Sequence, residues 1–256
     1  MEQFHARIAL QLYTVRDACE EDLPGTLQAI ADQGYNAVEL YTLHGETPAA
    51  WRALLDQVGL DPCSRHVSLD QLEAEPQRLV NEAHTLGLSR LVVPTMPRPA
   101  TVEEADAQVA RLARVAAEVV RRGLPLGYHN HAWELEPLDG SVTTFDRLVA
   151  VDPDLLFLEL DLGWAWQAGA DPAELLRRHA GRCPLVHVKD QSARDAPSVP
   201  VGTGAVPYRE VIDAARATGV EWLIVEQEHF DASGSVAAAA RSLEGLRGLL
   251  GPGRPA

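Results

Sequence analysis

The strongest constraint on the fold of this chain is a regular alternation of short apolar runs with longer amphipathic segments. A short strand that is apolar almost throughout is typical of a parallel sheet covered by helices. We predict eight such strands, at residues 8–12, 37–40, 60–66, 90–94, 125–130, 155–161, 185–189 and 222–227. Each is followed by a segment with helical spacing, at residues 23–33, 48–58, 70–86, 102–122, 143–151, 172–180, 207–218 and 235–250.

The number and length of these units favour one closed barrel. Eight βα units within 256 residues match the size of a (β/α)8 TIM barrel, an α/β fold. An open, doubly wound sheet would normally carry a glycine-rich phosphate loop after its first strand, whereas this chain has LQLYTVRDACEED there. No long linker or short-period repeat divides the chain. We therefore predict a single TIM-barrel domain over residues 1–256, with a frayed tail from about residue 251.

The charge balance argues against several kinds of partner. The net charge is -15, and nucleic-acid binders usually need a basic face, so we expect neither nucleic acid nor an anionic membrane as a partner. The sequence has no apolar run long enough to span a membrane and no signal-peptide pattern at its start. Its three cysteines fit no zinc or disulfide pattern, so we expect a cytoplasmic protein. Among the cations, Lys189 is the sole lysine.

Carboxylates and imidazoles gather where the predicted strands end, which is where TIM barrels carry their active sites. Taken singly, a histidine at a strand end is more often hydrogen-bonded scaffold, and a glutamate there is usually solvated. Three of these residues, however, lie in apolar runs: Asp161 ends FLELD, His187 is within LVHVK, and Glu226 is within LIVEQE. Burying such groups is costly without a partner, and a shared cation compensates them together. This ligand chemistry suits Mn²⁺, Zn²⁺, Co²⁺ or Mg²⁺.

Several motifs, in a fixed order, carry a resemblance to a known family. They are LQLYTVR, GYNAVEL, YHNHAWEL, LELDLGWAWQAGADP, HVKD, VGTGAVPY and WLIVEQE. With these motifs the chain resembles the xylose-isomerase-like TIM-barrel superfamily over nearly its whole length. The resemblance is to the sugar phosphate isomerase/epimerase branch, and the chain is also similar to inosose dehydratases and ketose epimerases.

The resemblance implies one divalent cation, with manganese expected first, held by Glu134, Asp161, His187 and Glu226. Two of these positions have rivals in the sequence. Glu228 competes with Glu226, because residues two apart in a strand share a side. On the fifth strand, His129 or His131 could replace or support Glu134. Residues expected to bind substrate are His66, Trp164, His129, His131 and Glu39.

The expected chemistry follows from these parts. A cation bound to the carbonyl and hydroxyl oxygens of a sugar acidifies the neighbouring C–H bond and stabilises the enediolate. Glu134 and Glu226 would remove and return a proton, and Lys189 would stabilise charge on a substrate oxygen. Return to the same carbon is epimerisation, and return to the next carbon is isomerisation. We therefore predict a metal-dependent isomerase or epimerase of a keto-sugar or inosose, with dehydration by loss of a β-hydroxyl group as the alternative.

Two other classes fit less well. An endonuclease IV-like DNA-repair enzyme would use three zinc ions and a basic groove, which the acidic composition disfavours. A non-catalytic sugar-binding barrel would not need paired proton carriers. We expect a small, non-phosphorylated sugar or cyclitol as substrate, because the cations near the predicted rim are few: Lys189, Arg194, Arg16 and Arg65, with VGTGAV as a weak phosphate loop. The sequence leaves a homo-oligomer open.

Overall fold

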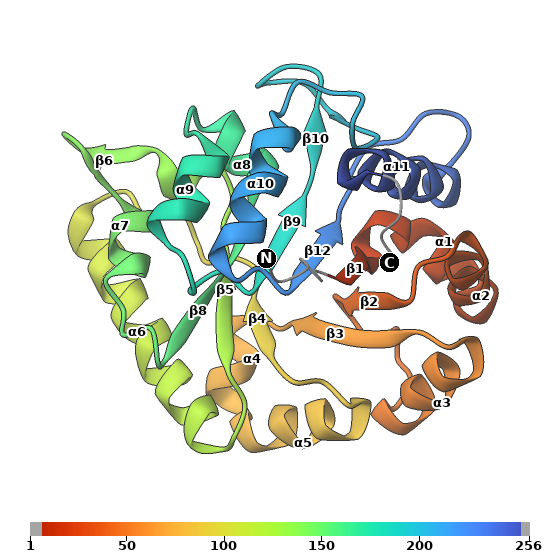
Figure 1. The fold of residues 1–256 in the computed structure, drawn as a ribbon. Helices are drawn as coiled ribbons and strands as arrows, with labels where there is room; N and C mark the ends of the chain where they lie inside the picture. The colour runs from red at the N-terminus through yellow and green to blue at the C-terminus, as the bar shows by residue number, and fades with distance from the viewer. Residues whose placement is uncertain (1–6, 252–256) are drawn as a thin grey trace.

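The structure, a computed structural model, describes residues 7–251, and its centre is a closed barrel of eight parallel strands. The strands follow one another around the barrel in chain order, and β12 closes it by pairing with β1 (Figure 1). Their bounds are β1 (Arg7–Gln11), β2 (Ala37–Leu40), β3 (Asp61–His66), β4 (Leu91–Val93), β5 (Leu126–His129), β8 (Leu156–Asp161), β9 (Leu185–Val188) and β12 (Trp222–Val225). The predicted (β/α)8 TIM barrel is confirmed. Part of the predicted frayed tail, residues 252–256, lies outside the described residues.

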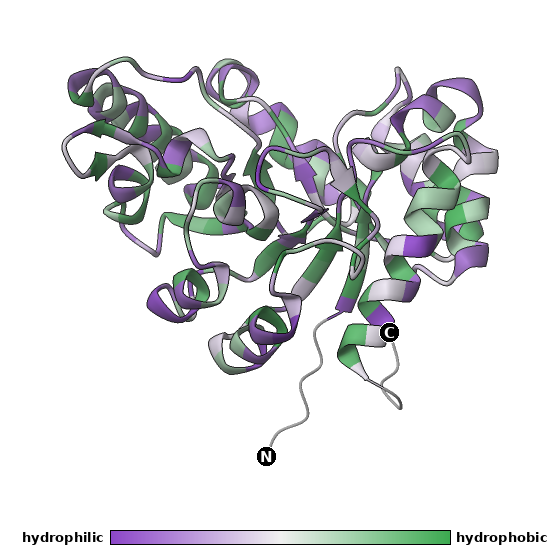
Figure 2. Ribbon diagram, turned by 90° about the horizontal axis from the view of Figure 1, so that it is seen from above, coloured by the Kyte–Doolittle hydropathy of each residue, from purple (hydrophilic) through white to green (hydrophobic). Residues whose placement is uncertain are grey.

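Helices cover the outside of this barrel, and they carry both apolar and polar residues where the strands are largely apolar (Figure 2). This is the amphipathic pattern expected of helices that pack one face on a sheet. The helices that follow the strands are α2 (Leu23–Gln33), α3 (Pro48–Val58), α4 (Leu69–Ala74), α5 (Pro76–Leu86), α6 (Val102–Arg121), α7 (Thr144–Val149), α8 (Leu162–Gln167), α9 (Pro172–Arg178), α10 (Tyr208–Thr218) and α11 (Ser235–Leu250). Within residues 7–251, none of them is both long and apolar enough to cross a membrane.

The predicted helix at residues 70–86 is wrong, because this segment forms two helices. Glu75 stands between α4 and α5 with an extended φ of -139°, and Pro76 begins α5. Proline lacks an N–H group and clashes with the preceding turn, so it is favoured at the first position of a helix and not inside one. The sequence analysis also missed short elements near the strand ends: η1 (Leu12–Val15), α1 (Arg16–Glu21), and the hairpins β6 (Pro137–Asp139) with β7 (Val142–Thr143) and β10 (Asp190–Gln191) with β11 (Ser198–Val199).

Side chains that point into the barrel form two layers of opposite character. Near the amino ends of the strands lies a lower layer of apolar residues: Ala9, Ala37, Cys63, Val92, Leu185, Trp222 and Ile224. The ring of Phe157 packs against it, and a Cβ atom on Gly127 would lie only 2.2 Å from that ring, so a larger residue there would force the ring to move. Two residues further along their strands, on the same face, lies an upper layer of polar residues: Gln11, Glu39, His129, Glu159, His187 and Glu226.

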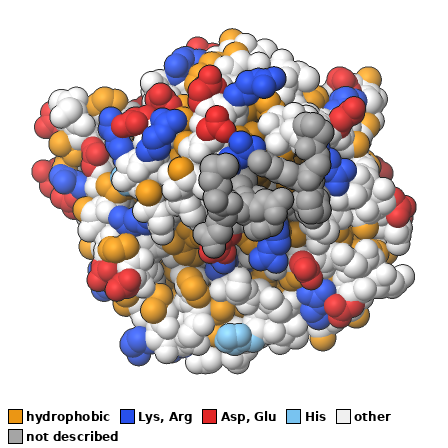
Figure 3. Space-filling view, viewed as in Figure 1, with side chains coloured by type: hydrophobic (Ala, Val, Ile, Leu, Met, Phe, Trp, Pro, Cys, Tyr) orange, Lys and Arg blue, Asp and Glu red, His pale blue; other side chains and the backbone are white. Residues whose placement is uncertain are grey.

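On the outer face shown in Figure 3, acidic and basic side chains are interspersed over the helices and are not gathered by sign. Charged side chains at the surface form short ion pairs, such as Arg90 with Glu221 at 2.7 Å and Arg147 with Asp106 at 2.9 Å. Exposed pairs of this kind add little stability, so the fold rests on the apolar interior.

Candidate metal centre and active site

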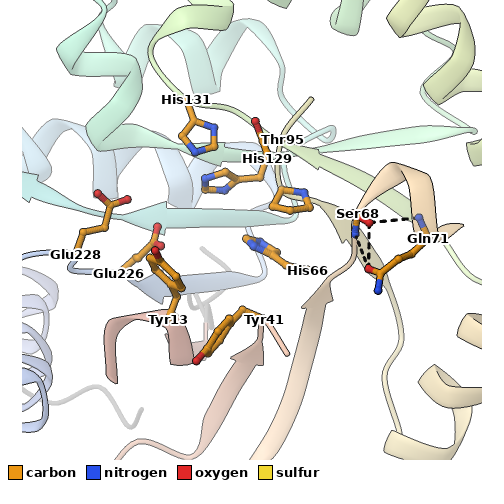
Figure 4. A pocket seen from close by; sticks show the side chains of 11 residues that line it. Tyr13, Tyr41, His66, Ser68, Gln71, Thr95, His129, His131, Glu226 and Glu228 are labelled. Carbon is orange, nitrogen blue, oxygen red and sulfur yellow. Dashed lines mark hydrogen bonds between the residues drawn. The ribbon is translucent and has the colours of Figure 1, made fainter. Parts of the chain in front are cut away.

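The carboxyl ends of six strands bring a dense group of ionisable side chains together. Glu39 lies in β2 one residue before its end, His66 ends β3, His129 ends β5 and His187 lies in β9, and all four are buried or nearly so. Strand β8 contributes Glu159 and Asp161, and Glu226 follows β12 directly. Because all these strands run the same way, their polar ends meet at one mouth of the barrel (Figure 4).

Three of the four predicted metal ligands lie close enough to share one ion. His129, Asp161, His187 and Glu226 each offer a ligand atom, and these atoms all lie within 4.8 Å of one another. His187 Nδ1 is 3.0 Å from Glu226 Oε2, and His129 Nε2 is 3.9 Å from Asp161 Oδ2. Asp161 Oδ2 is buried and, among the described residues, has no hydrogen-bond partner. Two carboxylates and two imidazoles fit a divalent cation, and Asp161 Oδ2 is held there only through its ion pair with the Lys189 ammonium group at 3.2 Å.

The fourth predicted ligand, Glu134, lies beside this group without joining it. Its carboxylate accepts a hydrogen bond from the Tyr128 hydroxyl at 2.8 Å and another from the His131 backbone N–H at 2.7 Å. Both oxygens are therefore already engaged, although the side chain is fully buried. The fifth-strand residue that the structure places in the ligand group is His129.

A second network of buried groups holds His187 from behind. His187 Nε2 is 2.7 Å from Glu39 Oε2, so this nitrogen faces away from Glu226, which faces Nδ1. Glu39 also accepts hydrogen bonds from Gln11 Nε2 at 2.7 Å and from Ser64 Oγ at 2.5 Å. A histidine that binds a metal through one ring nitrogen is often hydrogen-bonded to a carboxylate through the other. That carboxylate fixes the tautomer and the orientation of the imidazole ring. Glu39 has this position relative to His187.

The other carboxylate of this network, Glu159, lies among three imidazoles. Its Oε2 atom is 2.7 Å from His66 Nε2, 3.1 Å from His129 Nδ1 and 3.3 Å from His187 Nε2. Burial alone would raise the pKa of Glu159, but the imidazoles of His187 and His66 hold it well below its usual range. These four side chains form a second group with metal-ligand spacing. It shares His129 and His187 with the first group, so the two groups compete for the same imidazoles.

The electrostatic balance of the mouth favours positive charge. Burial opposes protonation of His187, yet the carboxylates of Glu159 and Glu39 raise its pKa well above the usual value. Burial likewise opposes ionisation of Glu226, yet Lys189 and His187 lower its pKa well below the usual value. The carboxylates are thus stable as anions only where cations stand beside them. A bound metal ion would supply that charge directly.

Lys189 is buried among these charged side chains, with 1% of its surface exposed. Its ammonium nitrogen is 2.8 Å from Glu228 Oε1, 3.0 Å from Glu226 Oε2 and 3.2 Å from Asp161 Oδ2. Burial would lower its pKa, but these three carboxylates raise it above its ordinary value. The ammonium group also lies 4.5 Å from the centre of the Trp164 ring. Lys189 is therefore a cation held directly against two of the predicted ligands.

The motif DLGW explains how helix α8 reaches this lysine. Asp161 caps α8 by accepting the Trp164 N–H at 2.8 Å, so the same carboxylate that faces the ligand group begins the helix. A Cβ atom on Gly163 would lie 2.3 Å from the Lys189 carbonyl oxygen. Only glycine allows the first turn of α8 to pack this closely on the end of β9.

A cavity of about 420 Å³ opens over the ligand group, and we call it the mouth cavity. Figure 4 shows the imidazoles and the two glutamates facing one another across it, with Tyr13 and Tyr41 at one side. It is lined by Tyr13, Tyr41, His66, Ser68, Gln71, Pro94, Thr95, His129, His131, Glu226 and Glu228. The cavity is large enough for a sugar and is bordered by both proton acceptors and aromatic rings.

The residues predicted to bind substrate are distributed in three places. His66, His129 and His131 line the mouth cavity. Glu39 is fully buried behind His187 and does not line it. The Trp164 ring lies 5.7 Å from that of His131, but Trp164 lines a different cavity.

Sequence reasoning gave no role to the residues that support the ligand group from within the barrel. Gln11, Ser64 and Glu159 belong to this set, and each of them is fully buried. A usable signal was the two-residue period of the strands, since Glu159 shares the inward face with Asp161. Ser64 has no comparable signal, because the register of β3 shifts beside it.

The fold and the mouth together define a TIM barrel with a candidate metal centre at the carboxyl ends of its strands. A family model described as Xylose isomerase-like TIM barrel matches residues 27–249, and the chain belongs to this family. The resemblance predicted from the sequence motifs is confirmed.

Among curated proteins, the chain is similar to an inosose dehydratase of Geobacillus kaustophilus (strain HTA426). The two are 31% identical over 204 residues, which cover 66% of this chain and 65% of the relative. The chain thus spans slightly less than two thirds of the length of that relative.

Solved structures share the fold over almost the whole chain. A sugar phosphate isomerase/epimerase from Parabacteroides distasonis ATCC 8503 superposes with a TM-score of 0.83 at 20% identity, covering 93% of this chain and 96% of that one. A protein called IOLI, whose crystal structure contains a bound zinc atom, superposes with a TM-score of 0.77 at 15% identity, covering 95% and 98%. At these identities the likeness establishes the fold alone.

Proposed function

We propose that this chain is a divalent-metal-dependent enzyme that removes a proton from the carbon next to the carbonyl group of a keto-sugar or an inosose. The observation that carries this proposal is the ligand group of His129, Asp161, His187 and Glu226, which borders the mouth cavity through His129 and Glu226. The inosose dehydratase relative supports the class of substrate. Such an enzyme would act on a small sugar or cyclitol in the cytoplasm, with neither nucleic acid nor membrane as a partner.

Asp161, His187 and Glu226 would hold the cation, and either His129 or Glu134 would complete the set. When bound, the cation would act as a Lewis acid toward the carbonyl and hydroxyl oxygens of the substrate. Manganese is our first choice, and zinc, cobalt or magnesium suit the same oxygen and nitrogen donors.

Glu226 is the residue we assign to proton removal. Its pKa is lowered, chiefly by Lys189 against the effect of burial, so the side chain is ionised and able to accept a proton at neutral pH. Glu134 is our second proton carrier, held in place by Tyr128 and by the backbone of His131. Return of the proton by a second carboxylate gives epimerisation at the same carbon or isomerisation to the next one.

Lys189 would contact the substrate oxygen on which negative charge develops. Its ammonium group is fixed against Asp161, Glu226 and Glu228 before any substrate binds, so little reorganisation is needed during reaction. His66 and His131 line the mouth cavity and would bind substrate hydroxyl groups.

Dehydration is the second candidate, and the inosose dehydratase relative favours it. In this reaction Glu226 would remove the same proton, and a hydroxyl group on the β-carbon would then leave as water. Dehydration needs one base and an acid for the leaving group, so it does not require a second carboxylate to return a proton to carbon.

One experiment tests the metal and the reaction together. The purified protein is analysed for bound metals and then incubated in D₂O with keto-sugars and inososes, followed by NMR. We expect one divalent ion per chain. Deuterium at the carbon next to the carbonyl, without loss of water, would indicate isomerisation or epimerisation, whereas loss of water would indicate dehydration. Three metal ions would point to an endonuclease IV-like enzyme, and binding without exchange would point to a sugar-binding protein.

Ligand variants complete this test. Asp161→Ala and His187→Ala should lose the metal and turnover together, because each substitution removes one of the side chains that bind the ion. His84→Ala, which changes a histidine in α5 away from the mouth, is the matched control. Full metal occupancy in both ligand variants would contradict the proposed centre.

A further inference from the structure

A second cavity lies beside the mouth cavity, and we call it the outer cavity. It has a volume of about 270 Å³ and is lined by Trp164, Gln167, Lys189, Gln191, Asp195, Ala196, Pro197, Ser198, Glu228 and His229. Glu228 lines both cavities, and its carboxylate is 2.8 Å from the Lys189 ammonium group. The Lys189–Glu228 ion pair is therefore the wall between them.

Two buried polar atoms in the lining of the outer cavity lack a partner among the described residues. They are the ring N–H of Trp164, a donor, and the side-chain oxygen of Gln191, an acceptor. Gln191 is 3% exposed, and its amide nitrogen donates to Gln167 Oε1 at 2.8 Å, which fixes the direction of the side chain. Buried polar groups without a partner are rare in folded proteins and need an explanation. Hydroxyl groups of a ligand can satisfy both kinds of atom, because a hydroxyl accepts and donates.

The charges around the outer cavity disfavour an anionic ligand. Its lining carries two carboxylates, Asp195 and Glu228, and one cation, Lys189, which three carboxylates already neutralise. The other cations that the sequence offered for a phosphate are also engaged. Arg65 faces Glu82 at 2.9 Å, and Arg16 donates to the carbonyl oxygens of Tyr13 and Glu228, while Arg194 donates to that of Trp166.

The backbone amides of the loop VGTGAV are likewise already hydrogen-bonded within the chain. The backbone N–H groups of Gly202, Gly204 and Val206 donate to the carboxylate of Asp190, at 2.8, 2.9 and 3.3 Å. Amides that already bind a carboxylate of the chain are not free to cradle a phosphate. The described surroundings of the mouth therefore favour a neutral ligand.

We propose that the outer cavity is a second subsite for the substrate, which binds the hydroxyl groups remote from the reacting carbon of a neutral polyol. This inference rests on the proposed function and adds to it where the remote hydroxyl groups of the neutral substrate bind, past the Lys189–Glu228 pair. Glu228 is the part of the wall that can yield, since 25% of its side chain is exposed whereas Lys189 is almost fully buried. Trp164 and Gln191 are specificity residues in this arrangement, and they do not take part in proton transfer.

The test uses ligand binding, which does not depend on turnover. Binding of myo-inositol, D-fructose and D-fructose 6-phosphate to the metal-loaded protein is measured by NMR titration. The variants are Trp164→Phe, which keeps an aromatic ring and removes the N–H donor, and Gln191→Met, which keeps the length and removes the acceptor. Trp166→Phe is the matched control, because Trp166 lies two residues away and outside the outer cavity.

We expect the native protein to bind the neutral polyols in preference to the phosphate. Trp164→Phe and Gln191→Met should each weaken polyol binding about tenfold, or 1.4 kcal/mol, while Trp166→Phe and the metal content of every variant stay unchanged. Preference for D-fructose 6-phosphate, absence of polyol binding, or equal affinities in all variants would overturn the subsite. Polyol binding that depends on Trp164 and Gln191, but with no deuterium exchange or water loss on any keto-sugar or inosose, would instead overturn the proposed function and leave the subsite standing.

Discussion

Two layers of side chains fill the barrel interior. Both consist of residues on the inward face of the strands, but the two layers differ in polarity. In four strands, a residue of the lower layer is followed two positions later by one of the upper layer: Ala9 by Gln11, Ala37 by Glu39, Leu185 by His187 and Ile224 by Glu226. The lower layer is apolar and gains stability from burial. The upper layer buries ionisable groups, which cost stability unless they compensate one another. The same two-residue period of the strands therefore places both the apolar core and the ionisable site inside the barrel. Substitutions in one layer should affect stability, and substitutions in the other should affect metal binding or turnover.

The lower layer offers the largest expected effect, and it falls on stability. Ile224→Ala should reduce the free energy of unfolding by about 2–5 kcal/mol, because it leaves a cavity in a fully buried site. Urea denaturation measures this loss, and a metal titration of the folded variant should give the native affinity. If the affinity for metal fell in step with stability, the two layers would not be independent.

Lys189, two residues beyond the upper-layer residue His187, should affect turnover without affecting stability to the same extent. Lys189→Met and Lys189→Arg should each lower turnover on the order of a hundredfold or more, because a preorganised donor toward developing charge is lost or misdirected. Metal content should be retained, which is checked by analysing the same preparations. Arg177→Met, a change at a surface cation in α9, is the control. Near-normal turnover in either lysine variant would make Lys189 a scaffold residue.

Glu39 sharpens the comparison, since it belongs to the upper layer but does not line the mouth cavity. Glu39→Gln should weaken metal binding about 10–100-fold, because the amide supports His187 less well than the carboxylate does. Competition with a chelator measures this affinity directly. Glu82→Gln serves as the control, because Glu82 pairs with Arg65 on the outside of the barrel. Equal affinities in the two variants would remove the positioning role of Glu39.

The smallest effect concerns a residue outside both layers. Burial lowers the pKa of His179 below its ordinary value of 6.5, and the nearby Arg182 and Arg178 add to this. The unfolded chain then binds a proton more readily than the folded one, so stability should fall as pH decreases from about 6.5 toward the lowered pKa. His179→Gln should flatten this part of the profile, as measured by urea midpoints between pH 5 and 7.5. An unchanged slope would assign it to other groups.

Much of the fold could be predicted because its signals are local. The helices Leu23–Gln33 and Pro48–Val58 begin and end where the sequence analysis places them, since Gly34 and Gly59 stop them in left-handed conformations. The segment at 70–86 went wrong because its apolar spacing continues across Pro76. The proline outweighs that spacing, since its missing N–H group ends one helix and starts another.

The candidate site could be predicted only in part, because its contacts depend on which strands become neighbours. Asp161, His187 and Glu226 stood out as costly groups in apolar runs, and the structure brings them together. The engagement of Glu134 by Tyr128 depends on a short turn after β5 that no periodicity reveals. The support of His187 by Glu39 joins residues 148 positions apart, so only the closed barrel brings them together.

The tetrapeptide HVKD at the end of β9 divides its residues between two sides of the sheet. His187 and Lys189 face the mouth, while Asp190 gathers the amides of the loop that contains Gly202 and Gly204. A one-residue insertion or deletion within it would exchange these sides, presenting a carboxylate to the substrate and sending the lysine toward the loop. The length of this stretch is therefore fixed for as long as the loop and the mouth are both in use.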